Sequence, residues 1–112
     1  MSQISIHVLD ISTGKPAEGI TAFLKKHDDP AIIEEISRGI TNHDGRIADL
    51  VSEISLSQGV YELVFEVDEY FSRERKACFY PRVSILFKLG EDEHCHIPLL
   101  LSPFGYSTYR GS

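Results

Sequence analysis

Residues 60–67 have the sequence VYELVFEV, in which apolar side chains occupy alternate positions, and residues 83–89, VSILFKL, repeat the pattern. Successive side chains of a β-strand point to opposite faces of its sheet, so each stretch presents one apolar row. The rows are Tyr61, Leu63, Phe65 and Val67 in the first stretch, and Val83, Ile85, Phe87 and Leu89 in the second. These rows predict two strands that contribute to one hydrophobic core.

Similar strand patterns lie on both sides of these stretches, separated by turn residues. We expect strands at residues 4–10, 20–26, 32–40, 46–50, 60–67, 83–89, 94–101 and 105–112. Strands that recur every 8–12 residues or so are typical of an all-β sandwich or barrel. Between them, STGKPAEG predicts a loop, and the Asp-Gly pair in NHDGR predicts a tight hairpin. One short helix is expected in DEYFSRERK, with Asp68 as its N-cap.

Length and composition limit the classes of function. A chain of 112 residues predicts a single domain over residues 1–112, large enough for its own core. The net charge of −6 and the scattered distribution of eleven Lys and Arg residues argue against a nucleic-acid partner. No stretch approaches the roughly 20 apolar residues of a membrane span. The first residues show no leader pattern, and Cys78 and Cys95 form no Cys-x-x-Cys pair, so we expect a cytoplasmic protein with reduced thiols.

Two histidines are expected on the outer face of the sandwich. Alternation in the strand at 4–10 turns His7 away from the core, and alternation at 94–101 does the same for His96. Leu9, Pro98 and Leu100 share this outer face, which is unusually apolar for a surface in contact with water. An apolar outer face of this kind predicts a contact between subunits.

The sequence gives little support for a metal site or for a catalytic nucleophile. His94 and His96 have the spacing of a two-residue metal clip, but His7, the obvious third ligand, has no Cys, Asp or Glu in matching register. We therefore expect no metal and no cofactor. No Gly-x-Ser-x-Gly motif or glycine-rich phosphate loop is present. Composition and periodicity alone predict a β-sandwich with a polar interface that carries histidines.

Three stretches carry a resemblance to a known family. HVLDISTGKPA, TNHDGR and HCHIPLLLSPFGYSTYRGS resemble the 5-hydroxyisourate hydrolases, the transthyretin-related enzymes of urate breakdown, and the resemblance covers residues 5–112. The terminal Tyr-Arg-Gly-Ser is the most specific element, because transthyretin shares the framework but neither this ending nor the histidines. Cys95 departs from the family, whose members commonly carry an aromatic residue there.

The resemblance implies a fold, an assembly and a reaction. The fold would be a transthyretin-like β-sandwich of two four-stranded sheets with one short helix, assembled as a homotetramer around a central channel. The reaction would be hydrolysis of 5-hydroxyisourate to 2-oxo-4-hydroxy-4-carboxy-5-ureidoimidazoline by direct attack of water on a cyclic amide. The implied catalytic residues are His7, His96 and Ser112, and the implied substrate-binding residues are Arg46, Tyr109, Arg110 and Gly111.

The resemblance also implies that the end of the chain belongs to the site. If the last strand lies beside the one that bears His96, Tyr109 and Gly111 share its channel face with Ser107. Which histidine is the general base stays open. Two other classes of function also stay open: a transthyretin-like carrier of small molecules without catalysis, and a purely structural or adhesive sandwich.

Overall fold

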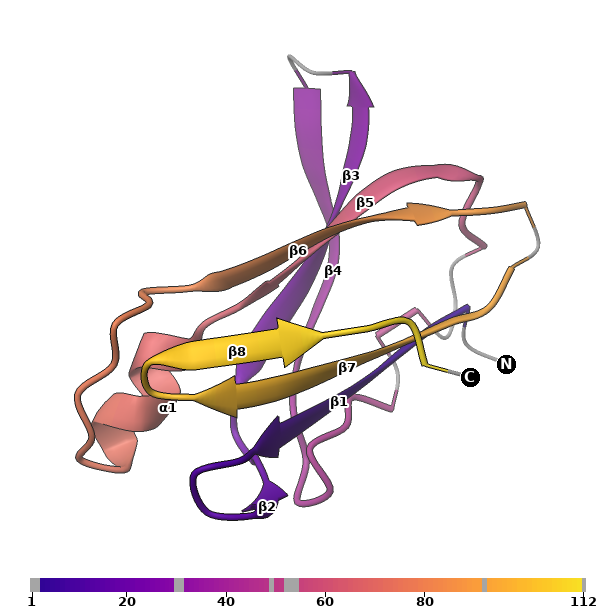
Figure 1. Ribbon diagram of the computed structural model, residues 1–112. Coiled ribbons are helices and arrows are strands. Elements are labelled where there is room, and N and C mark those ends of the chain that lie inside the picture. Colours follow the sequence, from indigo (N-terminus) through magenta and orange to yellow (C-terminus); the bar gives the residue numbers. More distant parts are fainter. Residues whose placement is uncertain (1–2, 30–31, 49, 52–54, 92, 112) are drawn as a thin grey trace.

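Two four-stranded sheets pack face to face in the computed structural model, which describes residues 3–29, 32–48, 50–51, 55–91 and 93–111 (Figure 1). One sheet has the order β2-β1-β7-β8 and the other the order β4-β3-β5-β6. The elements are β1 (Ile4–Asp10), β2 (Lys15–Pro16), β3 (Thr21–Asp29), β4 (Ile32–Ile40), β5 (Gly59–Phe65), α1 (Val67–Arg73), β6 (Val83–Leu89), β7 (Cys95–Ser102) and β8 (Gly105–Thr108). The predicted all-β sandwich of two four-stranded sheets with one short helix is confirmed.

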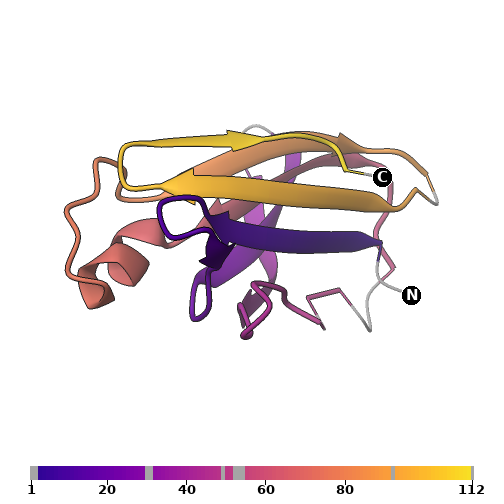
Figure 2. The ribbon, with the colours of Figure 1, turned by 60° about the horizontal axis from the view of Figure 1, so that its bottom comes forward.

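The first and the seventh strand are neighbours although they lie at opposite ends of the chain. β1 pairs with β7 in parallel, with Ser5 opposite His96 and His7 opposite Pro98. β8 pairs with β7 on the other side in antiparallel register (Figure 2). The two outward rows that carry His7 and His96 therefore lie side by side on one face of the sheet.

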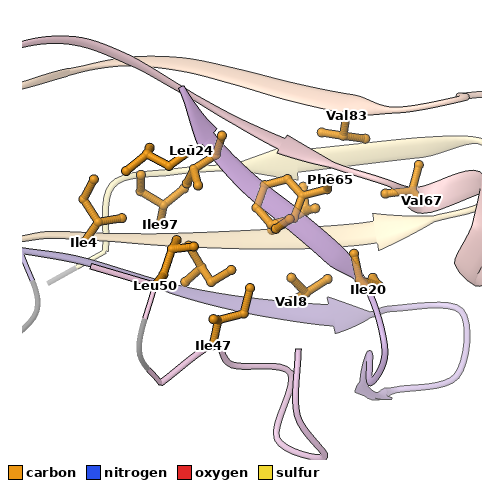
Figure 3. Close-up of a cluster of buried hydrophobic side chains, with 14 of the residues drawn as sticks. Ile4, Val8, Ile20, Leu24, Ile47, Leu50, Phe65, Val67, Val83 and Ile97 are labelled. Atoms are coloured by element: carbon orange, nitrogen blue, oxygen red, sulfur yellow. The ribbon is translucent and has the colours of Figure 1, made fainter. Parts of the chain in front are cut away.

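The core lies between the two sheets, where the buried side chains of both meet (Figure 3). Tyr61, Leu63, Phe65 and Val67 are all fully buried, as the first quoted stretch predicted. In the second stretch, Val83 and Leu89 are buried, but Ile85 and Phe87 are only partly covered because β6 is an edge strand. Fully burying an apolar side chain of this size stabilises the fold by about 1.5–3 kcal/mol.

The strand expected at residues 46–50 is not formed, and this prediction is wrong. The Asn42 Oδ1 atom accepts hydrogen bonds from the backbone N–H groups of Asp44 and Arg46, which curls the chain into a turn instead of a ladder. Ile47 and Leu50 are nonetheless buried in the core (Figure 3). These two side chains are apolar because the loop that carries them packs against the side of the sandwich.

The helix begins earlier than the sequence suggested. Its N-cap is Glu66, without a side-chain capping bond, so the expected N-cap Asp68 lies inside the first turn, where its charge complements the helix dipole. Val67 consequently belongs to the helix, and β5 ends at Phe65. No helix in the described part of the chain is long and apolar enough to cross a membrane.

The other deviations are small shifts of strand ends. The loop predicted at STGKPAEG contains the two-residue strand β2, paired with the end of β1. β3 runs three residues beyond its expected end at residue 26, and β7 is displaced by one residue at each end. β8 ends at Thr108, short of the predicted residue 112.

A buried carboxylate ties the helix to the first sheet. The Tyr70 hydroxyl donates a 2.8 Å hydrogen bond to Asp10 Oδ2, and Ser12 donates its backbone N–H and its hydroxyl to Oδ1. Burial by itself raises the pKa of Asp10, but these hydrogen bonds outweigh it and lower the pKa. A satisfied, ionised Asp10 holds α1 against the end of β1.

Candidate active site

The outer face of β1 and β7 carries both predicted histidines. β1 alternates between buried and half-buried residues along its whole length, and His7 is one of the half-buried ones. His96 is likewise half-buried on β7, between the buried Cys95 and Ile97. Alternation therefore predicted correctly which way both side chains point.

The imidazole of His96 is held on two sides. Its Nδ1 atom lies 2.8 Å from the Ser5 hydroxyl of the neighbouring strand. On the other side, the Gly111 N–H donates a 2.7 Å hydrogen bond to the His96 carbonyl oxygen, which forms an isolated β-bridge. A Cβ atom on Gly111 would lie 2.6 Å from His96 Cδ2, well inside contact distance. The chain end thus packs against the ring so closely that only glycine fits.

A glycine turn brings Arg46 to the same face. The Val8 N–H donates a 2.8 Å hydrogen bond to the Gly45 carbonyl, so the turn runs directly beside β1. Gly45 has φ +74°, and a Cβ atom there would lie 2.3 Å from the Val8 carbonyl oxygen. Glycine is required at this position on both grounds. The next residue, Arg46, is exposed, and its guanidinium is close enough to His96 to affect the pKa of that histidine.

The electrostatics of His96 reflect this crowding. Burial lowers the pKa of His96 below its ordinary value of 6.5, and the positive charges of Arg46, His7 and His94 lower it further. A hydrogen bond to the backbone of Ser5 opposes the shift in part. The lowered pKa favours the neutral form of His96, which can accept a proton.

Two residues of the predicted site, Tyr109 and Arg110, line a cavity at the edge of the sandwich. Arg110 Nη2 lies 3.2 Å from Glu93 Oε1, and together with Tyr109 it lines a cavity of about 240 Å³. The other walls of this cavity include Ile85, Phe87, Cys95 and Ile97, which face the core. Tyr109, which was expected on the face of His96, is 58% exposed and also lines this cavity, while Gly111 lies opposite His96 in the register of the last strand.

The seven predicted site residues are therefore only partly brought together. His7, His96, Arg46 and Gly111 meet on the outer face, whereas Tyr109 and Arg110 line the cavity on the other side of β7. Ser112 lies outside the described residues. Among the described residues, no three His, Cys, Asp or Glu side chains are grouped as metal ligands.

Two neighbours of His96 were not predicted as site residues. The Ser5 hydroxyl contacts the His96 ring and also lies 3.4 Å from His94 Nε2. Ser5 and His94 both fall on the outer face by alternation, so their orientation was readable from the sequence. Their proximity was not, because it depends on the parallel pairing of β1 with β7.

Comparison with known proteins gives a consistent assignment. A model of the HIUase/Transthyretin family matches residues 4–111. The chain is 40% identical to a 5-hydroxyisourate hydrolase of Salmonella dublin over 110 residues, which is 97% of this chain and 80% of the relative. It is similar to the structure of Klebsiella pneumoniae 5-hydroxyisourate hydrolase, with 40% identity, a TM-score of 0.86 and coverage of 99% and 100% of the two chains.

The fold alone does not separate a hydrolase from a carrier. Sea bream transthyretin in complex with thyroxine superimposes with a TM-score of 0.91 at 26% identity, covering 98% of this chain and 95% of the other. A structure that binds thyroxine thus resembles this backbone as closely as a hydrolase does. The side chains on the outer face of β1 and β7 have to distinguish the two functions.

Proposed function

The chain belongs to the HIUase/transthyretin family, and from this premise we propose that it hydrolyses 5-hydroxyisourate to 2-oxo-4-hydroxy-4-carboxy-5-ureidoimidazoline, with His7 and His96 as its acid–base groups. The observation that carries the proposal is the group formed by a neutral His96, His7 and Arg46 on one half-buried face. The proposed substrate is taken from the names of relatives at 37–40% identity, which are 5-hydroxyisourate hydrolases.

The chemistry follows from what hydrolysis of a cyclic amide requires. A base near neutrality takes a proton from the attacking water, and an acid delivers one to the departing ring nitrogen. Since Nδ1 of His96 is hydrogen-bonded to the Ser5 hydroxyl, Nε2 is the nitrogen that exchanges protons with water or substrate. His7, two residues from Ser5 on the same face, is the second acid–base group, and the order of the two roles stays open.

Positive charge is needed where the carbonyl oxygen becomes an oxyanion. The Arg46 guanidinium presents a fork of donors that suits the oxygens of a planar, purine-like substrate. After burial, its charge is the next largest cause of the lowered pKa of His96, so Arg46 supports the base and the oxyanion together. Ser112 is proposed to orient water or substrate, and Tyr109 and Arg110 to contact substrate through the assembled channel.

The assembly we propose is a homotetramer with two-fold contacts in the cytoplasm. Leu9 and Leu100 are paired side by side and only half-buried on the face that carries the histidines, while Pro98 is already covered within the chain. A second copy packed on this face would bury the two leucines and enclose the site between subunits. The Tyr109 and Arg110 of one subunit would then have to reach the channel from the subunit edge.

The experiment is a direct assay of turnover. The protein is incubated with freshly generated 5-hydroxyisourate, and the loss of ultraviolet absorbance is followed against the spontaneous rate. Acceleration that scales with enzyme concentration supports the proposal. A rate equal to the spontaneous one, together with tight binding of an apolar ligand such as thyroxine, would favour the carrier instead.

A further inference from the structure

We propose that Ser5 and His94 form a proton relay that connects His96 to solvent, an inference that rests on the hydrolytic function proposed above. The Ser5 hydroxyl lies between two imidazoles, 2.8 Å from His96 Nδ1 and 3.4 Å from His94 Nε2. His96 is half-buried, whereas His94 is exposed. The three side chains thus lead from the candidate site to the surface.

A hydroxyl is suited to this position because it donates one hydrogen bond while it accepts another. When Ser5 accepts from His96 Nδ1–H, its own proton points to His94 Nε2, and the reverse orientation is equally available. Ser5 therefore links the two rings in either direction. The contact to His94, at 3.4 Å, is long for a hydrogen bond, and catalytic hydrogen bonds often tighten when substrate binds.

The relay moves one proton without changing the hydroxyl. After His96 Nε2 takes a proton from the attacking water, the ring is an imidazolium. Its Nδ1–H bond breaks as the proton passes to Ser5 Oγ, and the Ser5 O–H bond breaks as its proton forms a new N–H bond at His94 Nε2. The positive charge has then moved to His94, and the reverse shift restores Nδ1–H when Nε2 gives its proton to the departing ring nitrogen.

The surroundings of His96 favour this displacement of charge. Burial of His96 and its electrostatic interactions with Arg46 and His7 lower its pKa, so an imidazolium at His96 is unfavourable. At His94 the charge meets water. The neighbouring carboxylate of Glu93 pairs with Arg110 and accepts a weak hydrogen bond from the Cys95 thiol. Transfer through Ser5 thus relieves a repulsion that the site itself creates.

The test uses His94→Gln, which removes the titratable ring at an exposed position, with Ser5→Ala and the double variant. Each single change should lower kcat about tenfold, the order expected for the loss of one neutral hydrogen bond that orients an acid–base group. The double variant should be no slower than Ser5→Ala, because both changes interrupt one path. Ser5→Thr keeps the hydroxyl and should retain most of the activity.

Chemical rescue distinguishes a relay from a structural role. Imidazole in the buffer should restore kcat of His94→Gln in proportion to its concentration, because a small base replaces the missing acceptor, and it should not restore Ser5→Ala. The acidic limb of the pH–rate profile should move to higher pH in His94→Gln, since the interaction with His94 contributes to the lowered pKa of His96.

The outcomes separate this inference from the hydrolase proposal. An inactive wild-type protein overturns the hydrolase. An active wild type whose His94→Gln variant keeps full kcat, or whose loss of kcat does not respond to imidazole, overturns the relay and leaves the hydrolase standing. Independent, multiplicative losses from Ser5→Ala and His94→Gln would also contradict a single path.

Discussion

Replacing Gly111 with alanine should remove most of the activity while leaving the fold intact. The new Cβ atom would lie 2.6 Å from His96 Cδ2 and 3.2 Å from Cγ, whereas ordinary contact begins at 3.4 Å. The ring must therefore retreat by the difference, about 0.8 Å, or the chain end must lift from β7 and break the 2.7 Å hydrogen bond to the His96 carbonyl. A displacement of about 1 Å in a reacting group costs roughly 10²-fold in rate.

The assay is kcat for 5-hydroxyisourate, measured beside thermal unfolding. Gly111 is not among the residues of the hydrophobic core, so the unfolding free energy should change by no more than about 0.5 kcal/mol. Gly105→Ala is the matched control, because the nearest atom to its Cβ is Ser102 Oγ at 3.8 Å and the same methyl group fits there. Wild-type kcat in Gly111→Ala, or an equal loss in Gly105→Ala, would refute the placement of the chain end against His96.

Three further predictions test the site. His7→Ala and His96→Ala should each lower kcat by roughly 10²–10⁴-fold without loss of folding, since both side chains lie on the non-core face; near-wild-type turnover in either variant removes that residue from the mechanism. The mechanism uses neutral His96, whose pKa is lowered by burial and by Arg46. The acidic limb of the kcat/KM profile should therefore lie below pH 6.5 and move to higher pH in Arg46→Gln. A limb that stays at the same pH in this variant contradicts the electrostatic coupling. Deletion of residues 109–112 should abolish hydrolysis and spare the core, and a C-terminal tag should impair it, whereas full activity of the truncated chain would exclude the terminus from the site.

The core residues could be predicted from the local sequence, because side chains alternate between the buried and the exposed face along a single strand. The row from Tyr61 to Phe65 is buried as alternation requires, and the outward direction of His7 and His96 follows from the same rule. The strand expected at residues 46–50 shows where the rule fails. Ile47 and Leu50 are buried from a loop, because the Asn42 Oδ1 atom accepts backbone hydrogen bonds that compete successfully with ladder pairing.

The outward direction of His7 and His96 was thus determined by the sequence, but which residues lie beside them was decided by the tertiary structure. Ser5 and His96 are separated by 91 positions and meet only because β1 pairs in parallel with β7. Arg46 reaches the same face because Gly45 allows its turn to approach Val8. Arg110 lies on the opposite side because the register that pairs Thr108 with Leu99 continues to Gly111 opposite His96, which turns Arg110 toward the cavity. Strand pairing and loop approach are contacts between distant segments, whose free energy depends on the whole packed sandwich, so no local pattern of residues specifies them.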